Sequence, residues 1–284
     1  MFKRKPKTET SPPIAMPVTG TMLSHPGRVR ERNEDVVAFA LAGEPGTPAG
    51  RGTLALVADG MGGHAAGEVA SRIAADTVLR LYFELDGPPP DVLTKCLKAA
   101  NRAIRERSKA DPLCAGMGTT CTVLALRDDA VFLAHIGDSR AYVLSGGELR
   151  QISDDHSLVA QLVREGALTE ADAARSPERN VILRALGITR SPRPTIWPRG
   201  RPLRAGDVFV LCSDGLSDLV DDATIGETVG RLPPFDACQV LLDAALAAGG
   251  TDNVSVGVFV AGGDRPPTGW ARITRAVELP GGLP

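Results

Sequence analysis

The chain has 284 residues, of which 43% are hydrophobic and 23% charged, and its formal net charge is −2. That balance supplies no electrostatic attraction for nucleic acid or for an anionic membrane. Aromatic residues make up only 4% of the chain, so stacking platforms for single-stranded nucleic acid are not expected either. Five cysteines without a CxxC pair argue against a zinc ribbon or a disulfide framework and favour a reducing compartment.

Both ends of the chain are expected to lie outside the folded domain. Residues 1–19 are rich in Lys, Pro and Thr, and residues 262–284 carry several Pro and Gly, so the sequence predicts two flexible tails. The basic N-terminus lacks the apolar run of a signal peptide, and no stretch approaches the ~20 apolar residues of a membrane span. We expect one domain over residues 20–261 and a cytoplasmic location.

The first half of this domain predicts two strands followed by two helices. Short apolar runs at 36–41 and 53–58 are typical of strands. Apolar side chains at helical spacing then predict helices over 70–81 and 93–104. Asp91, which follows a run of three prolines, is expected to cap the second helix.

The second half of the domain begins with strands again. Runs at 120–126 and 131–136, joined by Arg127-Asp128-Asp129, predict a hairpin, and Ser145-Gly146-Gly147 marks a second turn. A polar, helical stretch follows over 156–186. The last predicted elements are strands at 208–212 and 254–260 and a helix at 235–248. Strands arranged around two consecutive helices favour a layered α+β architecture over alternating βαβ units.

Aspartates sit where four of the predicted strands begin or end. Asp59, Asp138 and Asp214 follow strands, and Asp252 comes just before one. A buried carboxylate is costly unless its charge is compensated, and four that converge favour a cation. Oxygen ligands without Cys or His select Mg²⁺ or Mn²⁺ over zinc. A simple turn explains any single Asp-Gly pair, but four strand-end aspartates favour a shared metal site.

A charged run, Arg30-Glu31-Arg32-Asn33-Glu34-Asp35, lies just before the first predicted strand. Such runs usually form solvated surface. The functional interpretation instead places the acids near a metal and the arginine at an oxyanion, because the planar guanidinium matches phosphate geometry. The sequence alone leaves both interpretations open.

Together these stretches resemble the bacterial type 2C (PPM) protein phosphatases. Any one matching segment is weak evidence, but eight in the order and spacing of the family are highly specific. The segments are GRVRERNED (27–35), LVADGMGGHAAGE (56–68), GMGTT (116–120), HIGDSRAY (135–142), ISDDHSLVAQLVREGALT (152–169), NVILRALG (180–187), GDVFVLCSDGLSD (206–218) and GTDNVSV (250–256). The resemblance implies a four-layer α-β-β-α sandwich, in which two antiparallel β-sheets are flanked by helix pairs. It also implies a metal cluster at one end and a variable flap at about 154–186.

The resemblance also assigns roles to individual residues. Asp59 would bridge two metal ions, the carbonyl of Gly60 would bind one of them, and Asp214 and Asp252 would complete the binuclear centre. Asp138, with Asp214, matches the pair that binds a third ion in bacterial members. Arg30 would bind phosphate, and Glu34 and Asp35 would hold metal-bound waters. Asp218 occupies a position where the family also has an acid near the metals. Asn253 would either orient Asp252 or form a purely structural turn.

The activity implied by the resemblance is hydrolysis of phosphoserine and phosphothreonine in proteins. Two Mn²⁺ or Mg²⁺ ions, with a third expected, would share a bridging hydroxide that attacks phosphorus in line. A Ser/Thr kinase that the enzyme opposes is the expected partner. Animal members carry a histidine two residues after the bridging aspartate, but here that residue is Met61, and His64 does not align with it. The general acid therefore stays open, and a metal-bound water is the favoured candidate.

Other functions were less well supported by the residues. Some relatives lose the metal ligands and act as binding modules, whereas this chain retains every expected ligand. A related branch acts on anti-sigma-factor antagonists, usually with sensor domains, and none is visible here. A cysteine phosphatase needs a CxxxxxR loop, and Cys96 with Arg102 and Cys121 with Arg127 match that spacing. Both pairs fall in predicted helix or strand without glycines, so we interpret them as chance.

Overall fold

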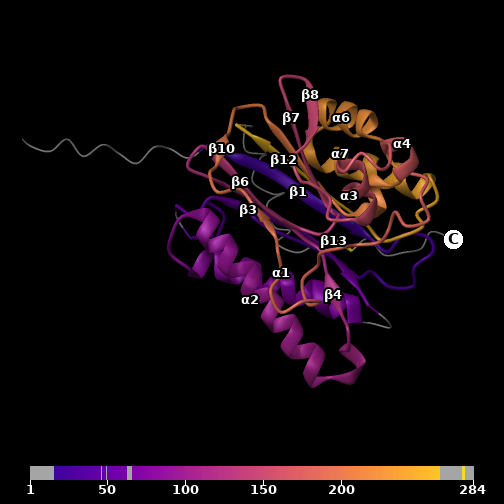
Figure 1. Cartoon of the computed structure of the whole chain (residues 1–284). Helices are drawn as coiled ribbons and strands as arrows, with labels where there is room; N and C mark the ends of the chain where they lie inside the picture. The colour runs from indigo at the N-terminus through magenta and orange to yellow at the C-terminus, as the bar shows by residue number, and fades with distance from the viewer. Residues whose placement is uncertain (1–15, 46, 49, 63–65, 263–276, 279–284) are drawn as a thin grey trace, which may run out of the picture.

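The computed structural model describes residues 16–262, apart from 46, 49 and 63–65, together with residues 277–278. Two β-sheets pack face to face and helices cover their outer faces, which confirms the expected α-β-β-α layers (Figure 1). In the first sheet, here sheet A, the strand order is β13 (Val277–Glu278), β1 (Val18–His25), β12 (Val254–Ala261), β11 (Val208–Cys212), β7 (Arg140–Ser145) and β8 (Glu148–Gln151).

The second sheet, here sheet B, is built around the first half of the chain. Its strand order is β10 (Arg201–Pro202), β6 (Ala130–Ile136), β5 (Cys121–Arg127), β3 (Thr53–Met61) and β2 (Asp35–Ala40), with β4 (Gly118–Thr119) beside β3 and β9 (Thr195–Ile196) beside β6. All these pairings are antiparallel, and in sheet A only the short β1–β13 pair is parallel among the described strands.

Alternating side chains divide each strand between two hydrophobic cores. On β3, Leu54 and Leu56 face the helices outside sheet B, whereas Ala55 and Val57 face sheet A. The inter-sheet core is closed by an edge-to-face contact between Phe39 on β2 and Phe259 on β12, with ring centroids 5.7 Å apart. Burial on both faces explains why these strands are continuously apolar in the sequence.

Two long helices cover sheet B and confirm the expected helix pair. They are α1 (Ala66–Glu84) and α2 (Pro89–Ala110), and their apolar faces pack on Leu54 and Leu56. The expectation that Asp91 caps α2 is wrong, because the N-cap is Pro88. Prolines suit the first turn, where their missing N–H would be unpaired anyway, and Asp91 instead places a negative charge in that turn.

The outer face of sheet A is covered by helices from the last third of the chain. They are α5 (Asp214–Ser217), α6 (Asp222–Arg231), which the sequence analysis missed, and α7 (Pro234–Ala247). The stretch 156–186 is less helical than expected, with only α3 (Leu158–Arg164) and α4 (Glu170–Ala173) among irregular segments. A 3₁₀ turn, Pro112–Cys114, follows α2.

Both predicted hairpins are confirmed. Asp128 and Asp129, between β5 and β6, have φ values of 53° and 58°, and Gly146 and Gly147, between β7 and β8, have φ values of 61° and 85°. Two consecutive left-handed residues form the turn whose twist matches paired antiparallel strands. Asp tolerates this conformation better than most residues with a Cβ.

Two described strands extend beyond the domain boundaries expected from the sequence, which stay a prediction. Strand β1 begins at Val18, two residues before the expected start, and was not predicted as a strand. Residues 277–278, within the expected C-terminal tail, pair with Leu23 and Ser24 of β1. We propose that the domain begins at Val18. Among the described residues, no helix combines the length and apolar character that crossing a bilayer requires.

The inter-sheet contact gives a test of the packing. Replacing Phe259 with Ala should lower the free energy of unfolding by about 3–5 kcal/mol, because it removes a fully buried ring. Urea unfolding followed by circular dichroism measures this loss. The matched control, Leu113→Ala, removes a side chain that is 79% exposed and should change stability by less than about 0.5 kcal/mol. Similar values for the two variants would contradict the packing described here.

Candidate active site

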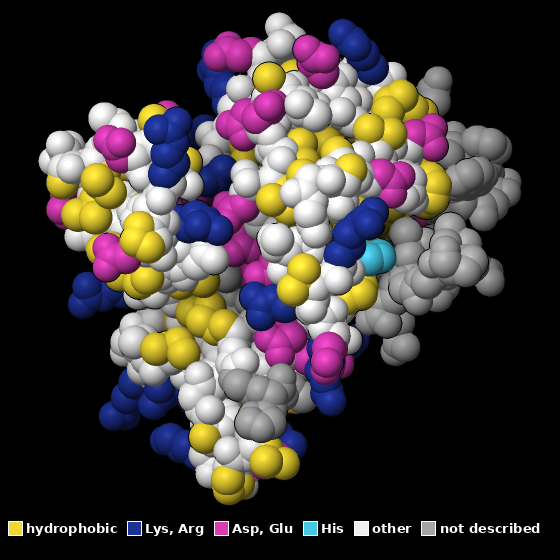
Figure 2. All heavy atoms as spheres, turned by 90° about the vertical axis from the view of Figure 1, so that its right-hand side faces the viewer, with side chains coloured by type: hydrophobic (Ala, Val, Ile, Leu, Met, Phe, Trp, Pro, Cys, Tyr) yellow, Lys and Arg dark blue, Asp and Glu magenta, His cyan; other side chains and the backbone are white. Residues whose placement is uncertain are grey.

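A pocket of about 780 Å³ opens at one end of the sandwich. Seven of the residues singled out from the sequence line it: Arg30, Glu34, Asp59, Gly60, Asp214, Asp252 and Asn253. They come from the segment before β2, the end of β3, the start of α5 and the turn before β12. Figure 2 shows one face of the molecule on which acidic side chains gather in a hollow.

Strand alternation explains why carboxylates converge at this end. Asp35 and Asp59 are directly opposite each other in the β2–β3 register. Asp35 lies on the same face as Val37, and Asp59 on the same face as Val57, so both carboxylates point between the sheets where the apolar core stops. Like charges directly opposite each other destabilise a sheet, so this pair needs compensation.

Asp59 and Asp214 lie close enough for each carboxyl to shift the pKa of the other. Burial raises the pKa of both carboxyls, that of Asp214 to about 6, and neighbouring carboxylates raise them further. The backbone around Asp59 is fixed by Thr120, whose Oγ1 accepts the Asp59 N–H at 2.9 Å. Asp59 therefore has a firmly held backbone and a carboxyl placed beside another acid.

Asp35 sits in a chain of buried hydroxyls that the sequence analysis did not identify. Ser213 Oγ donates to Asp35 Oδ2 at 2.7 Å and accepts the backbone N–H of Ser255 at 3.0 Å. Ser24 Oγ lies 2.8 Å from Ser255 Oγ. Burial nevertheless raises the pKa of Asp35 to about 7. The available sequence signal was a polar residue at an inward-facing position of an otherwise apolar strand.

Asp138 lies deeper, next to the same acids. It is 7% exposed, and burial, followed by the charge of Asp214, raises its pKa well above the ordinary range. Its loop is held by His156, which takes the Gly137 N–H on Nδ1 at 3.2 Å and donates its own backbone N–H to the Gly137 carbonyl at 2.7 Å. Because Nδ1 accepts, the ring proton is on Nε2, which lies 3.0 Å from Thr195 Oγ1.

Arg30 and Asp252 form an ion pair across the pocket, with Nη2 and Oδ2 2.7 Å apart. The Arg30 side chain is 57% exposed. Arg30 and Glu34 of the charged run thus line the same pocket as Asp59, Asp214 and Asp252.

Asn253 combines the two roles considered for it. Its backbone N–H donates to Asp252 Oδ1 at 2.8 Å, which orients that carboxylate. Its side chain accepts the Glu34 N–H at 2.8 Å and donates to the carbonyls of Pro26 and Arg32 at 2.9 and 2.8 Å. One amide thus ties the segment that carries Arg30 and Glu34 to the turn before β12.

Position 60 requires a glycine because the backbones of neighbouring segments approach it too closely for a side chain. A Cβ at this position would lie 2.2 Å from the Gly67 carbonyl oxygen and 2.6 Å from that of Glu34. A Cβ on Gly67 would in turn lie 2.4 Å from Glu34 Oε2. The two glycines let β3, the first turn of α1 and the Glu34 side chain meet, and burial raises the pKa of Glu34.

The remaining predicted residues lie at the edge of the pocket or beyond it. Asp218 is one helical turn from Asp214, has a pKa raised by burial, and lies 3.8 Å from Arg179 of the flap. Asn180 and Ile182 of the flap line the pocket, as does Met61. His64 lies outside the described residues.

The donor set fits divalent cations. Three buried carboxylate oxygens, on Asp35, Asp138 and Asp214, have no hydrogen-bond partner among the described residues. Every candidate ligand is an oxygen, as Mg²⁺ and Mn²⁺ prefer. Within the same described residues, no group of three or more acidic, His or Cys side chains is arranged so that it could already hold a metal ion. The Arg30–Asp252 ion pair offsets part of the negative charge.

The sequence profile of Protein phosphatase 2C matches residues 34–246, three quarters of the chain. The chain belongs to the protein phosphatase 2C family. The serine/threonine protein phosphatase PstP of Mycobacterium tuberculosis is 43% identical over 233 residues, which cover 81% of this chain and 42% of that protein. The chain thus spans about two fifths of the length of PstP. The serine/threonine phosphatase stp of Listeria monocytogenes is 33% identical and is covered to 90%.

Solved structures of the family have the same fold. The crystal structure of M. tuberculosis PstP superposes with a TM-score of 0.77 at 40% identity, covering 86% of this chain and 98% of that one. The catalytic domain of PstP in complex with two manganese ions superposes with a TM-score of 0.75 at 38% identity, covering 87% and 99%. The family resemblance and the fold expected from the sequence are confirmed.

Because the acids repel one another, replacing one of them with a neutral residue should increase the free energy of unfolding in a pH-dependent way. The raised pKa of Asp214 means that this group favours the fold most when protonated. The contribution of protonated Asp214 to the free energy of unfolding is fully present below its ordinary pKa of 3.8. This contribution is lost as the pH rises through about 6. In EDTA at pH 8, Asp214→Asn should therefore be more stable than the wild type by about 1–3 kcal/mol, and at pH 4 the two should be equal.

Thermal unfolding at the two pH values measures this effect, with Asp76→Asn, an exposed change on α1, as the control of equal charge. Excess Mn²⁺ should raise the Tm of the wild type more than that of Asp214→Asn, because the ion stabilises only a fold that binds it. A variant less stable than the wild type at pH 8 in EDTA would contradict the electrostatic account.

Proposed function

We propose that this chain is a metal-dependent protein phosphatase that hydrolyses phosphoserine and phosphothreonine. The observation that carries the proposal is the convergence of buried carboxylates, three of them with an unpaired oxygen, beside an exposed arginine in an open pocket. Clustered acids with raised pKa values cost stability, which a binding module would have no reason to retain. The names of the relatives and the two manganese ions in the PstP catalytic domain support the same function.

The ligands we propose for two Mn²⁺ or Mg²⁺ ions are Asp59, Asp214, Asp252 and the Gly60 carbonyl, with Asp138 and Asp214 for a third. Bound there, such ions would lower the pKa of water and offset negative charge on a phosphoryl group. Asp59 and Asp214, whose pKa values are raised, would have to be deprotonated to become ligands. Glu34 and Asp35 would accept hydrogen bonds from water.

Arg30 would bind the phosphoryl group of the substrate. Its guanidinium donates one hydrogen bond to Asp252 and is otherwise exposed toward the pocket. The remaining N–H groups are therefore oriented to donate hydrogen bonds to phosphate oxygens. Asn253 maintains this arrangement by tying the Arg30 segment to Asp252. We infer an in-line displacement, in which positioning and electrostatic stabilisation supply most of the catalysis.

The described residues that line the pocket include no histidine, and the Met61 thioether cannot donate a proton. We propose a metal-bound water as the source of the leaving-group proton, which is the candidate that the sequence favours while it leaves the general acid open. An opposing Ser/Thr kinase, phosphorylated protein substrates and a cytoplasmic location stay predictions.

Asp59→Asn should reduce Mn²⁺-dependent hydrolysis of a phosphothreonine peptide by at least about a hundredfold, because an amide supplies less negative charge and cannot bridge cations. Initial rates are compared in Mn²⁺ and in EDTA, with Asp76→Asn as the control that loses the same charge from an exposed helical position. Near-normal activity of Asp59→Asn, or wild-type activity that survives EDTA, would refute the proposed metal site.

Arg30→Ala should raise KM for the same peptide about tenfold or more with a smaller effect on kcat, because the arginine contacts phosphate already in the bound substrate. Arg28→Ala is the matched control, since Arg28 is exposed nearby but does not line the pocket. Equal KM values for the two variants would remove Arg30 from the phosphate site.

A further inference from the structure

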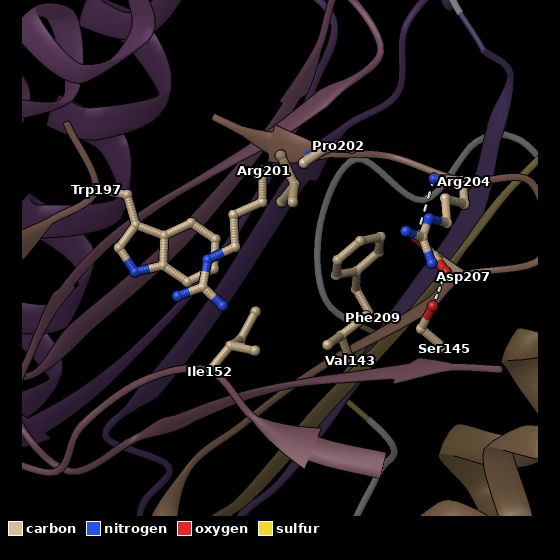
Figure 3. Close-up of a pocket in the computed structure, with 10 residues that line it drawn as sticks. Val143, Ser145, Ile152, Trp197, Arg201, Pro202, Arg204, Asp207 and Phe209 are labelled. Carbon is tan, nitrogen blue, oxygen red and sulfur yellow. Dashed lines mark hydrogen bonds between the residues drawn. The ribbon is translucent and has the colours of Figure 1, made fainter. Parts of the chain in front are cut away.

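A second cavity lies at the opposite end of the sandwich from the candidate active site. Strands β6 and β11 run toward Asp138 and Asp214, and the cavity is lined by residues at their other ends, including Val131 and Phe209. Figure 3 shows this site, with Trp197 and Arg201 from the β9–β10 segment on one side and Phe209 and Ser145 of sheet A on the other.

The floor of this distal cavity is apolar. Val131, Val143, Ile152 and Phe209 line it, and the Trp197 indole forms a further wall (Figure 3). The one buried charge at its edge, Asp207, is already satisfied, because it accepts from Ser145 Oγ at 2.6 Å and from the Arg204 backbone N–H at 2.9 Å. The cavity therefore offers its occupant hydrophobic contact and no unmet hydrogen bond.

The size of the cavity suits a single ring. Its volume is about 130 Å³. Apolar cavities of about 150 Å³ bind benzene, so one aromatic side chain fills a site of this size. A nucleic-acid base would need an open stacking face, but the face of Trp197 is covered by the Arg201 guanidinium, 3.8 Å from the ring centroid.

The chain segment that borders the cavity is strongly basic although the whole chain is slightly acidic. Five arginines and no acidic residue occur within 190–204: Arg190, Arg193, Arg199, Arg201 and Arg204. All five are exposed, and none has a carboxylate within ion-pair distance among the described residues. Arg201 and Arg204 border the cavity itself. Guanidinium groups without an ion-pair partner beside an apolar cavity are complementary to an acidic segment with one apolar side chain that fills the cavity.

We propose that this distal cavity is a docking site for an acidic segment of a partner protein, which inserts one aromatic side chain between Phe209 and the Arg201 guanidinium that covers Trp197. Acidic residues on either side of the anchor pair with Arg201 and Arg204. The site is separate from the candidate active site, so it recruits the partner without taking part in phosphoester hydrolysis and stands independently of the proposed activity.

Trp197 reports on its own site. The chain has two tryptophans, so Trp270→Phe leaves Trp197 as the single indole fluorophore. Titration of this protein with the acetylated peptide Glu-Asp-Phe-Asp-Glu should change the Trp197 emission with saturation. Replacing the peptide's Phe with Ser should weaken binding at least about tenfold, because the anchor is lost. Replacing its acids with Lys should abolish binding.

Two charge-reversal variants distinguish docking at the cavity from nonspecific electrostatic attraction of the acidic peptide. Arg201→Glu with Arg204→Glu should weaken peptide binding at least about tenfold and leave hydrolysis of a small phosphate ester unchanged. Arg190→Glu with Arg193→Glu makes the same charge change in the same segment away from the cavity and should alter affinity by less than about threefold. Unchanged thermal unfolding checks that both proteins are folded.

Three results would overturn the proposal: no saturable change in Trp197 emission, equal affinity for the Phe and Ser peptides, or equal losses from the two double variants. Tighter binding of a single-stranded oligonucleotide than of the peptide would likewise assign the arginines to nucleic acid instead.

Discussion

The repulsion among buried carboxylates is the constraint on which the rest of the site depends. Asp35, Asp59, Asp138 and Asp214 come from separate strands and loops, yet burial and one another's charge raise all four pKa values. The fold tolerates them because serine hydroxyls and the Arg30 ion pair each compensate part of the charge. The compensation is incomplete, since three buried oxygens have no partner among the described residues. An arrangement of this kind is unfavourable alone and becomes favourable with cations.

The two-sheet architecture produces this convergence through simple geometry. Side-chain alternation sends every second residue of β2 and β3 into the space between the sheets, and the apolar core of that space ends where Asp35 and Asp59 follow. The pairing of antiparallel strands brings the ends of β3 and β11 and the start of β12 to the same edge. Gly60 and Gly67 then allow α1 to begin against β3 with no side chain between them. The scaffold is thus rigid where the proposed ligands lie, which is what electrostatic preorganisation requires.

Much of this could be predicted from the sequence, because strong periodicity marks buried strands and the two long helices. The strand-end positions of Asp59, Asp214 and Asp252 also showed that acids would meet, and the family motifs assigned their roles. Three features could not be predicted. Strand β1 is too mixed in composition to stand out, the cap of α2 is a proline whose suitability depends on context, and the hydroxyl chain of Ser24, Ser213 and Ser255 exists only once distant strands pair. The basic cavity around Trp197 was likewise invisible, since its walls come from both sheets.

The central claim is that these acids form the cage of a divalent metal centre. Anomalous diffraction at the manganese edge, from crystals grown in excess Mn²⁺, tests it most directly. The account predicts two strong peaks between Asp59, Asp214 and Asp252, with the Gly60 carbonyl among the ligands and Arg30 released from Asp252. An absence of peaks at this end of the sandwich, with Arg30 still paired to Asp252 in excess metal, would contradict it.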